Sequence, residues 1–397
     1  MRMRFDRMEW AGSLGDLGTL LPLSFALIMI NGLSATGLFL SVGLMYVIGG
    51  LYYGIPIAVQ PMKVVSAYAV GMALSAQVVT ASGMLLAVLL LVLGATGLVD
   101  FVARVVPRAV VRGVQLSTGV LLLSKGVRMV IGTSPFQTMQ GAAEPFLAIS
   151  SIGPVPMSLI FGLGFAVVAL LLLNSKRYPA GLVVVGFGAV AGALFGAWRE
   201  LGGVDLGFHL PEILPFGFPT GADFSFALFA LVLPQVSMTV GNAVIAYRDL
   251  SNEYFGKESL KVTDRAVCIS MGLANVFSAL VGGMPMCHGA GGLAAHYRFG
   301  ARTNGANLII GAAFIVLAIL FGPGSVNALH LLPMGVLGVL LIFSGIQLAL
   351  TVRDMRARTD LFIIVVMLGI TLTANLAWAF GVGIALWHLF RKLNLTA

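Results

Sequence analysis

The sequence predicts an all-α protein that crosses a lipid bilayer many times. Three observations lead to this fold class. The 397 residues are 59% hydrophobic and only 10% charged, whereas a soluble globular chain carries about 25% charged residues. The mean hydropathy is +1.01. Long apolar runs are separated by short loops, and no stretch is long and polar enough to form a separate soluble domain.

Glycine, proline and charged residues divide the chain into fourteen apolar segments, with a more polar linker after the seventh. The first seven are Leu14–Asn31, Thr36–Gly54, Pro61–Leu74, Val78–Val99, Val110–Val130, Met157–Leu173 and Ala180–Ala197. The second seven are Phe224–Tyr247, Leu260–Gly282, His288–Phe299, Ala306–Phe321, Ala328–Leu350, Leu361–Asn375 and Trp378–Phe390. The third segment of each set, segment three and segment ten, is interrupted. We therefore expect two short half-helices, each preceded by an extended strand.

The basic residues predict the orientation of these segments. With the N-terminus inside, 19 of the 23 Lys and Arg residues fall in the inner loops, as the positive-inside rule expects. Both termini are therefore predicted to be cytoplasmic, and the net charge of +8 does not indicate nucleic-acid binding. We expect Met1–Trp10 to be a cytoplasmic cap because no cleavage-site pattern follows it. Two cysteines in or beside apolar runs do not indicate a disulfide framework.

An odd number of segments in each half places the two halves in opposite orientations, which is the inverted-repeat plan of several secondary transporters. We expect a first repeat over residues 1–198, an extracellular linker over 199–222 and a second repeat over 223–397. Interruptions at matching places in two such halves indicate a transporter's substrate site. The sequence therefore predicts that the substrate site lies between the two breaks.

The first break is Ile55–Lys63, and the second is Gly283–Leu293. Pro61 suits the first turn of a helix, and the residues before a proline favour extended geometry. Gly289, Gly291 and Gly292 would let an oxyanion approach the backbone at the second helix start. The alternative is that these glycines only allow close helix packing.

Lys63 and Asp16 are the charged residues near these breaks. Two helix starts of about +0.5 each and one ammonium sum to about +2, which matches a tetrahedral dianion. The alternative for Lys63 is that its side chain reaches the inner membrane surface. One hypothesis for Asp16 is that it is protonated when the anion binds, which would couple transport to protons. The alternative is a helix N-cap at the membrane edge.

Segment eight offers three polar residues, Gln235, Thr239 and Asn242, spaced for one face of an α-helix. They would donate hydrogen bonds to an oxyanion, or would join helices to one another. His288 is expected to be a donor to the anion or a proton-sensitive group. Adjacent residues such as Cys287 and His288 do not face each other, so we expect neither a metal site nor a covalent mechanism.

The candidate substrate-binding residues are therefore Gln60, Pro61, Met62, Lys63, Gln235, Thr239, Asn242, Cys287, His288, Gly289, Ala290, Gly291 and Gly292. Asp16 is the candidate for proton coupling. No cofactor is expected, and the expected partners are an oxyanion and the lipid bilayer. A homodimer is left open.

Several motifs together resemble the molybdate transporter family, which is related to the sulfate permeases. They are Gly15–Thr19, Val59–Lys63, Pro234-Gln235 with Asn242, and Pro285–Leu293 with Tyr297–Arg302. The resemblance implies two inverted seven-segment repeats, with a core of segments 1–4 and 8–11 and a gate of segments 5–7 and 12–14. It implies molybdate import without the cytoplasmic regulatory domain that sulfate permeases usually carry.

Other functions remain open at this point. Sulfate and tungstate differ from molybdate mainly in size, and segment eight departs from the family pattern at Val236-Ser237 and Met238–Ala243. A bicarbonate or nucleobase carrier would use the same architecture, although segment eight lacks the acidic residue expected of a nucleobase site. A channel needs a continuous polar path, and the polar residues here cluster at one depth. An intramembrane enzyme lacks a nucleophile–base pair.

Overall fold

The computed structural model describes residues 3–99, 101, 106–173, 175, 178–203 and 206–393. Within these residues, seven helical stretches are long and apolar enough to cross a membrane, and two further apolar helices are shorter. The protein is therefore a helical membrane protein, as predicted. Four of the basic residues assigned to inner loops lie outside the described residues, namely Arg2, Arg104, Lys176 and Arg177.

The first half of the described chain is built from helices and three two-residue strands, of which β2 pairs with β3 and β1 pairs with β4 of the second half. Its elements are α1 (Arg7–Ser13), α2 (Leu17–Asn31), α3 (Ala35–Tyr53), β1 (Gln60–Pro61), α4 (Lys63–Met72), α5 (Ala76–Thr96), α7 (Arg108–Ile131), α8 (Pro135–Gln140), β2 (Ser151–Ile152), β3 (Val155–Pro156), α9 (Met157–Leu172), α10 (Ala180–Leu194) and the 3₁₀ turn η1 (Ala197–Gly203).

The second half contains π-helical turns within its long helices. Its α-helices and strand are α11 (Gly221–Ala227), α12 (Leu233–Met238), α13 (Ala246–Phe255), α14 (Asp264–Leu280), β4 (Met286–Cys287), α15 (Ala290–Phe299), α16 (Gly305–Val316), α17 (Ser325–Leu329), α18 (Met334–Ala349), α19 (Arg358–Thr373) and α20 (Leu376–Leu393). The π turns are η2 (Leu228–Val232), η3 (Thr239–Ile245) and η5 (Leu317–Phe321), and the 3₁₀ turns are η4 (Gly256–Ser259), η6 (Gly322–Gly324) and η7 (Leu350–Asp354).

Two predicted segments are divided in the structure. The segment predicted over Leu14–Asn31 begins earlier and breaks between α1 and α2, where a Cβ at Gly15 would lie 2.7 Å from the Ala295 carbonyl oxygen of α15. The segment predicted over Ala328–Leu350 breaks before α18 at Pro333, which is extended (φ −56°, ψ 145°). Proline has no N–H for a helical hydrogen bond, so a helix starts after it more easily than it continues through it.

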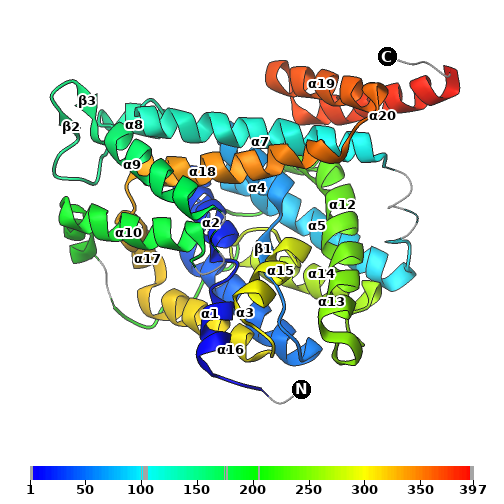
Figure 1. Ribbon diagram of the computed structural model, residues 1–397, viewed down its shortest axis with the longest axis horizontal. Coiled ribbons are helices and arrows are strands. Elements are labelled where there is room, and N and C mark those ends of the chain that lie inside the picture. The colour runs from blue at the N-terminus through cyan, green and yellow to red at the C-terminus, as the bar shows by residue number, and fades with distance from the viewer. Residues whose placement is uncertain are drawn as a thin grey trace.

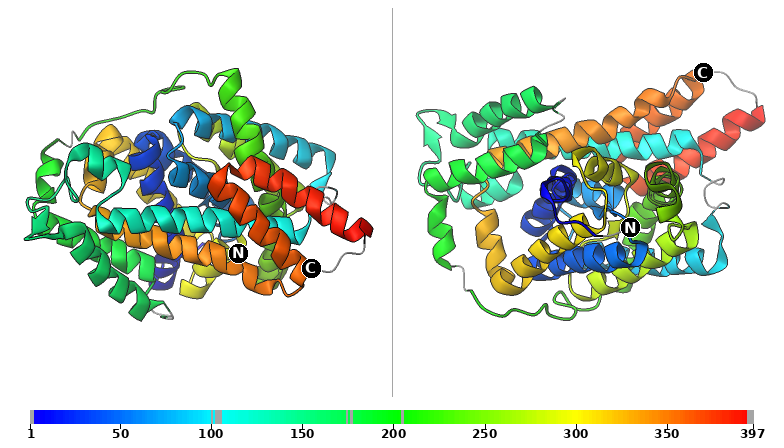
Figure 2. Two further views of the ribbon diagram at one scale, coloured as in Figure 1. Left: turned by 90° about the horizontal axis from the view of Figure 1, so that it is seen from above. Right: turned by 60° about the horizontal axis from the view of Figure 1, so that its bottom comes forward.

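Helices α7 and α18 lie side by side and antiparallel along one side of the molecule (Figure 1). A Cβ at Gly119 would lie 2.6 Å from the carbonyl oxygen of Gly345, and one at Gly126 would lie 2.5 Å from that of Gly338. Small residues at these two levels let the helix backbones approach closely, which is how helices associate in a membrane. Helices α19 and α20 pack against α7, as the views in Figure 2 show.

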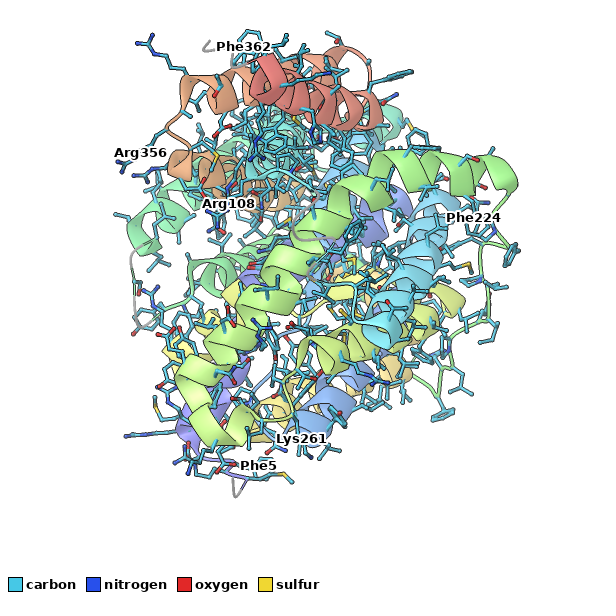
Figure 3. The ribbon with its side chains drawn as sticks, turned by 90° about the vertical axis from the view of Figure 1, so that its right-hand side faces the viewer. Phe5, Arg108, Phe224, Lys261, Arg356 and Phe362 are labelled. Carbon is cyan, nitrogen blue, oxygen red and sulfur yellow. The ribbon has the colours of Figure 1, made fainter. Side chains whose placement is uncertain are left out.

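Helix α2 contacts the strand of the first predicted break and α14 contacts that of the second. Each break consists of a two-residue strand followed by a ten-residue helix, β1–α4 and β4–α15. Helix α3 packs on α16 and α5 packs on α14 around them. Figure 3 views the molecule from the right-hand side of Figure 1 and labels Arg108, Lys261 and Arg356, which belong to regions predicted to be cytoplasmic. The orientation in the membrane stays a prediction.

Candidate functional site

Strands β1 and β4 join the two breaks in the interior of the protein. They pair antiparallel, with Gln60 opposite Cys287 and Pro61 opposite Met286. The N–H of Met62 donates to the carbonyl oxygen of Pro285 at 2.9 Å. All six residues are buried. Irregular backbone is tolerated at membrane depth only where protein or a cavity shelters it, and this pairing provides the shelter.

Two asparagines satisfy the backbone on either side of this pair. The Asn307 carboxamide accepts from the N–H of Ile57 at 2.9 Å and donates to its carbonyl oxygen at 2.8 Å. The Asn275 carboxamide makes the same two bonds with Met286, each at 2.8 Å. Because an unpaired buried amide costs about 1–3 kcal/mol, each asparagine holds its strand in place.

The start of α4 is capped by Gln235 from segment eight. Its Oε1 accepts from the backbone N–H groups of Val64 at 2.9 Å and Val65 at 3.3 Å. Its Nε2 donates to the Thr239 hydroxyl at 2.9 Å. Gln235 and Thr239 therefore share a helix face, as predicted, and this face points to α4. Lys63 is the first residue of that helix.

The start of α15 lies against Asp16 and Gln60. Gln60 Nε2 donates to Asp16 Oδ1 at 2.8 Å. A Cβ at Gly289 would collide with Gln60 Oε1, and one at Gly292 would collide with Asp16 Oδ2. Both oxygens are buried and accept no hydrogen bond from the described residues. Asp16 occupies the N-cap position of α2 but makes no capping bond there, so the helix-cap alternative does not describe its side chain.

His288 lies behind the strand pair and is bonded to protein on both ring nitrogens. Nδ1 is 2.8 Å from the carbonyl oxygen of Ala58, and Nε2 is 2.9 Å from the Ser270 hydroxyl, which is also 2.9 Å from the Tyr53 hydroxyl. A carbonyl only accepts, so Nδ1 carries the proton and Nε2 accepts from Ser270. The ring stacks on Tyr247 with centroids 5.4 Å apart. The roles predicted for His288 toward an anion stay predictions.

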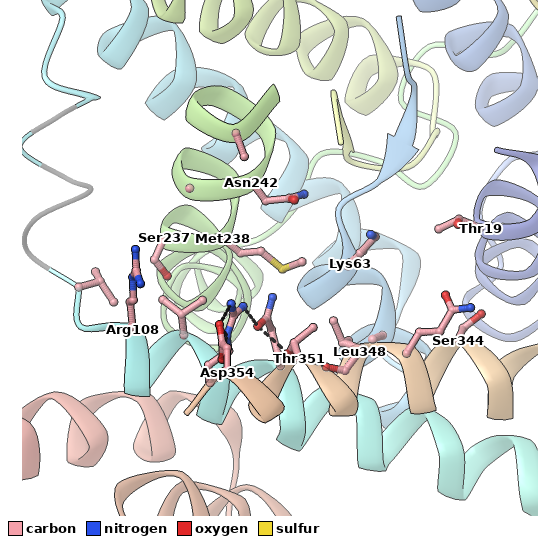
Figure 4. Close-up of a pocket in the computed structure, with 18 of the residues that line it drawn as sticks. Thr19, Lys63, Arg108, Ser237, Met238, Asn242, Ser344, Leu348, Thr351 and Asp354 are labelled. Carbon is pink, nitrogen blue, oxygen red and sulfur yellow. Dashed lines mark hydrogen bonds and ion pairs between the residues drawn. The ribbon is translucent and has the colours of Figure 1, made fainter. Parts of the chain in front are cut away.

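A cavity of about 790 Å³, called the main cavity below, lies between the break region and the α7–α18 pair. Thr19, Lys63 and Asn242 line it on one side, and Ser344, Gln347 and Thr351 line it on the other. Figure 4 shows Lys63 among these residues. Lys63 thus lines this cavity, and its position relative to the membrane surface stays a prediction.

The charged residues that line this cavity are mainly basic. They are Lys63, Arg108, Arg112 and Asp354. Arg112 forms an ion pair with Asp354, and its Nη1 donates to Gln115 Oε1 at 2.8 Å. Lys63 and Arg108 therefore give the described lining an excess of two positive charges. This lining attracts anions, and its hydroxyl and carboxamide groups can donate hydrogen bonds to oxyanions.

The structure separates the predicted site residues into two groups. Lys63 and Asn242 line the cavity, whereas the others lie in or beside the strand pair and the two helix starts. The prediction that Asn242 shares a face with Gln235 assumed a regular α-helix. The π turn over Thr239–Ile245 changes that spacing, so Asn242 faces the cavity while Gln235 caps α4.

Sequence reasoning gave no binding role to six uncharged polar residues that line the cavity, namely Thr19, Gln115, Ser237, Ser344, Gln347 and Thr351. Ser344 and Gln347 stand out as polar residues inside an apolar segment, which is the signal that could have identified them. Among the described residues, no group of three or more His, Cys, Asp or Glu side chains could hold a metal ion.

Comparison with known proteins gives consistent results. A family model described as "Molybdate transporter of MFS superfamily" matches residues 8–122 and 227–348. Molybdate transporter 2 of Arabidopsis thaliana is 32% identical over 418 residues, covering 98% of this chain and 88% of the relative. Molybdate transporter 1 of Chlamydomonas reinhardtii is 30% identical, with 95% and 90% covered. A guanine/hypoxanthine permease of Escherichia coli O157:H7 is 26% identical, with 81% and 76% covered.

Two solved structures share the fold. The transmembrane domain of a cyanobacterium bicarbonate transporter, BicA, has a TM-score of 0.64 at 16% identity and covers 97% of this chain and 98% of its own. The murine Solute Carrier 26 family member A9 anion transporter, in the inward-facing state, has a TM-score of 0.68 at 17% identity. It covers 99% of this chain and 69% of its own.

Proposed function

Because this chain belongs to the molybdate transporter family, we propose that it is a secondary carrier that imports molybdate as a tetrahedral dianion. The observation that carries the proposal is Lys63. It is the first residue of a buried half-helix, and it lines the main cavity. An ammonium at a helix N-terminus adds a full positive charge to about half a charge from the helix. Such a site suits a dianion.

The site is proposed to consist of Lys63 and Asn242 at the cavity, with the strand pair and both helix starts behind them. Gln60, Pro61 and Met62 would set the position of Lys63, with Gln235 and Thr239 supporting it from segment eight. Cys287, His288 and the run Gly289, Ala290, Gly291 and Gly292 would do the same for the second helix start. Sulfate and tungstate are the nearest alternative substrates, since they have the same shape and charge.

The proposed transport cycle uses the architecture of two inverted seven-segment repeats. Residues 1–198 and 223–397 would form the repeats, joined by an extracellular linker. Segments 1–4 and 8–11 would form a core that moves against a gate of segments 5–7 and 12–14, exposing the site to each side in turn. Support comes from the main cavity, which lies between α2, α4 and segment eight on one side and α7 and α18 on the other. Both termini are proposed to be cytoplasmic, and a homodimer is compatible with the scheme.

Proton coupling through Asp16 is a further part of the proposal. Asp16 Oδ2 is buried and accepts no hydrogen bond from the described residues, so a proton can be added there without breaking one of the bonds described. Asp16→Asn is expected to abolish the pH dependence of uptake while retaining anion binding. Unchanged pH dependence in this variant would reject the coupling role and leave the anion site unaffected.

The decisive experiment is uptake of radiolabelled molybdate into proteoliposomes, with and without a pH gradient. Sulfate, tungstate, uracil and hypoxanthine serve as competitors. We expect competition by the oxyanions and none by the nucleobases. Stronger competition by a nucleobase would show that the substrate is a nucleobase and not an oxyanion. Absence of any molybdate uptake or binding would overturn the proposal.

A further inference from the structure

We infer that Ser344 and Gln347 of α18 bind the transported oxyanion from the side of the cavity opposite Lys63. The inference rests on the proposed function and adds a second set of ligands to it. Lys63 would hold the anion by charge, and the two α18 residues would hold it by neutral hydrogen bonds.

The position of Ser344 and Gln347 on α18 supports this inference. Ser344 and Gln347 are three residues apart, so they lie on neighbouring parts of one helix face. Both line the main cavity that Lys63 and Thr19 also line, and Figure 4 shows Ser344 and Lys63 on different helices beside it. Polar residues inside a membrane-spanning helix face the protein interior or a water-filled cavity. Here they face the cavity.

The side-chain donors of Ser344 and Gln347 are available to a ligand. Neither Ser344 nor Gln347 forms a side-chain hydrogen bond with the residues that the structure describes. The Thr351 hydroxyl, one turn further along the same wall, lies 2.8 Å from the Leu348 carbonyl oxygen and 2.9 Å from Gln115 Oε1, and its single proton is shared between these two acceptors. The wall thus has a bonded polar group at Thr351 and two groups that are free to bind a ligand.

Helix α18, which carries these donors, is held firmly against α7. Gly338 and Gly345 pack against the α7 backbone, where a Cβ at either would lie within 2.7 Å of a carbonyl oxygen. At about 100° per residue, Ser344 and Gln347 are roughly 100° and 160° around the helix from Gly345. The glycine face therefore fixes α18 against α7 while the polar face is left for the cavity.

The chemistry of the two side chains fits an oxyanion. A serine hydroxyl donates one hydrogen bond and a glutamine carboxamide donates two, and neither adds a negative charge near a dianion. A bound anion would then contact both the core and the gate. Anion binding would favour the state in which the core and the gate lie close together, because a ligand shifts an equilibrium toward the state that it contacts better.

The test measures equilibrium binding and proteoliposome uptake of radiolabelled molybdate for Ser344→Ala, Gln347→Met and the double variant. A neutral hydrogen bond contributes about 0.5–1.5 kcal/mol, so each single variant is expected to lose roughly two- to twelve-fold in affinity or in uptake at low substrate concentration. Gln347→Glu should lose more, because it adds a negative charge. Ser344→Thr keeps the hydroxyl and should stay near the native value.

Ser225→Ala is the matched control. Ser225 lies outside the cavity lining, and its hydroxyl donates to the Gly221 carbonyl oxygen at 2.9 Å, so an effect below about two-fold is expected. If native protein transports molybdate and the double variant binds and transports it equally well, this inference is wrong and the proposed function stands. If native protein handles no oxyanion, the proposed function itself fails. Should the double variant not fold, Gln347→Glu and Ser344→Thr decide the question.

Discussion

The two half-helices begin in similar geometry but in different electrostatic surroundings. Helix α4 begins at Lys63, and its first free amides donate to the neutral carboxamide of Gln235. Helix α15 begins beside Asp16, whose Oδ2 would lie 2.4 Å from a Cβ at Gly292. Each of these neighbouring side chains, Gln235 and Asp16, comes from the opposite half of the chain. The α4 start is therefore more positive than the α15 start.

This difference bears on where the anion binds. Lys63 lines the main cavity, and none of the glycines at the α15 start does so. A symmetric site between two equivalent helix tips, as the sequence suggested, would expose both starts to the cavity. We therefore expect the anion nearer to α4, with the α15 start and Asp16 behind it.

The largest effect on transport is expected from removing the positive charge at α4. Lys63→Ala should lower molybdate affinity by about ten- to a hundred-fold, because hydrogen bonds to charged groups contribute about 1.5–3 kcal/mol. Equilibrium binding to the purified protein measures this. The control is Lys261→Ala, since Lys261 donates to the Tyr52 carbonyl oxygen and lies outside the cavity lining. Near-native affinity in Lys63→Ala would remove the basis for an asymmetric site.

The cap of α4 offers the next test. Gln235→Glu keeps an acceptor for Val64 and Val65 but places a negative charge at the helix start, so it should fold normally and bind molybdate about tenfold more weakly. Gln235→Leu removes the acceptor and should lower the free energy of unfolding by about 1–3 kcal/mol. Thermal unfolding and binding assays separate the two effects. Native affinity in the Gln235→Glu variant would mean that a charge at the start of α4 does not affect anion binding.

Substitution of the glycines at the start of α15 tests the surroundings of the second half-helix. Gly289→Ala and Gly292→Ala would place a Cβ on Gln60 Oε1 and Asp16 Oδ2, whereas a Cβ at Gly291 meets no atom within 4 Å. The first two should lose about 1–3 kcal/mol of stability and part of the uptake. Gly291→Ala is the matched control and should behave like native protein. Equal behaviour of all three would show that Asp16 and Gln60 are not close to this helix start.

The smallest effect on transport is expected at a helix start outside the cavity. Glu144 accepts from the backbone N–H groups of Met334 and Gly335 at the start of α18, each at 2.8 Å. Burial raises the pKa of this carboxyl from 4.5 to about 7. The folded state thus favours the protonated form, and stability should fall as pH rises from about 4.5 to about 7. The loss is about 3 kcal/mol, since one pKa unit corresponds to about 1.36 kcal/mol.

Glu144→Gln should flatten this pH profile and leave molybdate uptake unchanged. Thermal unfolding between pH 4.5 and 8 checks the first statement, and proteoliposome uptake checks the second. If native protein and variant lose stability in parallel, Glu144 is not the titrating group.

Much of this organisation follows from the sequence because membrane depth makes local signals strong. A proline and a lysine inside an apolar segment indicated the first break, and a glycine run indicated the second. The partners of these residues were not predictable, because they come from distant segments, as Gln235 does for α4 and Asn307 for Ile57. The π turn over Thr239–Ile245 was missed because helical spacing was assumed. Ser344 and Gln347 gained meaning only when the structure placed them beside Lys63.

The first break depends on side chains from the second half of the chain, which has a consequence for biosynthesis. Residues 55–63 emerge from the ribosome long before Gln235 and Asn307, which later satisfy their amides and those of α4. An N-terminal fragment ending in the linker would hold unsatisfied backbone at membrane depth, a costly state. Such a fragment should be degraded when produced alone and rescued when the second half is expressed beside it.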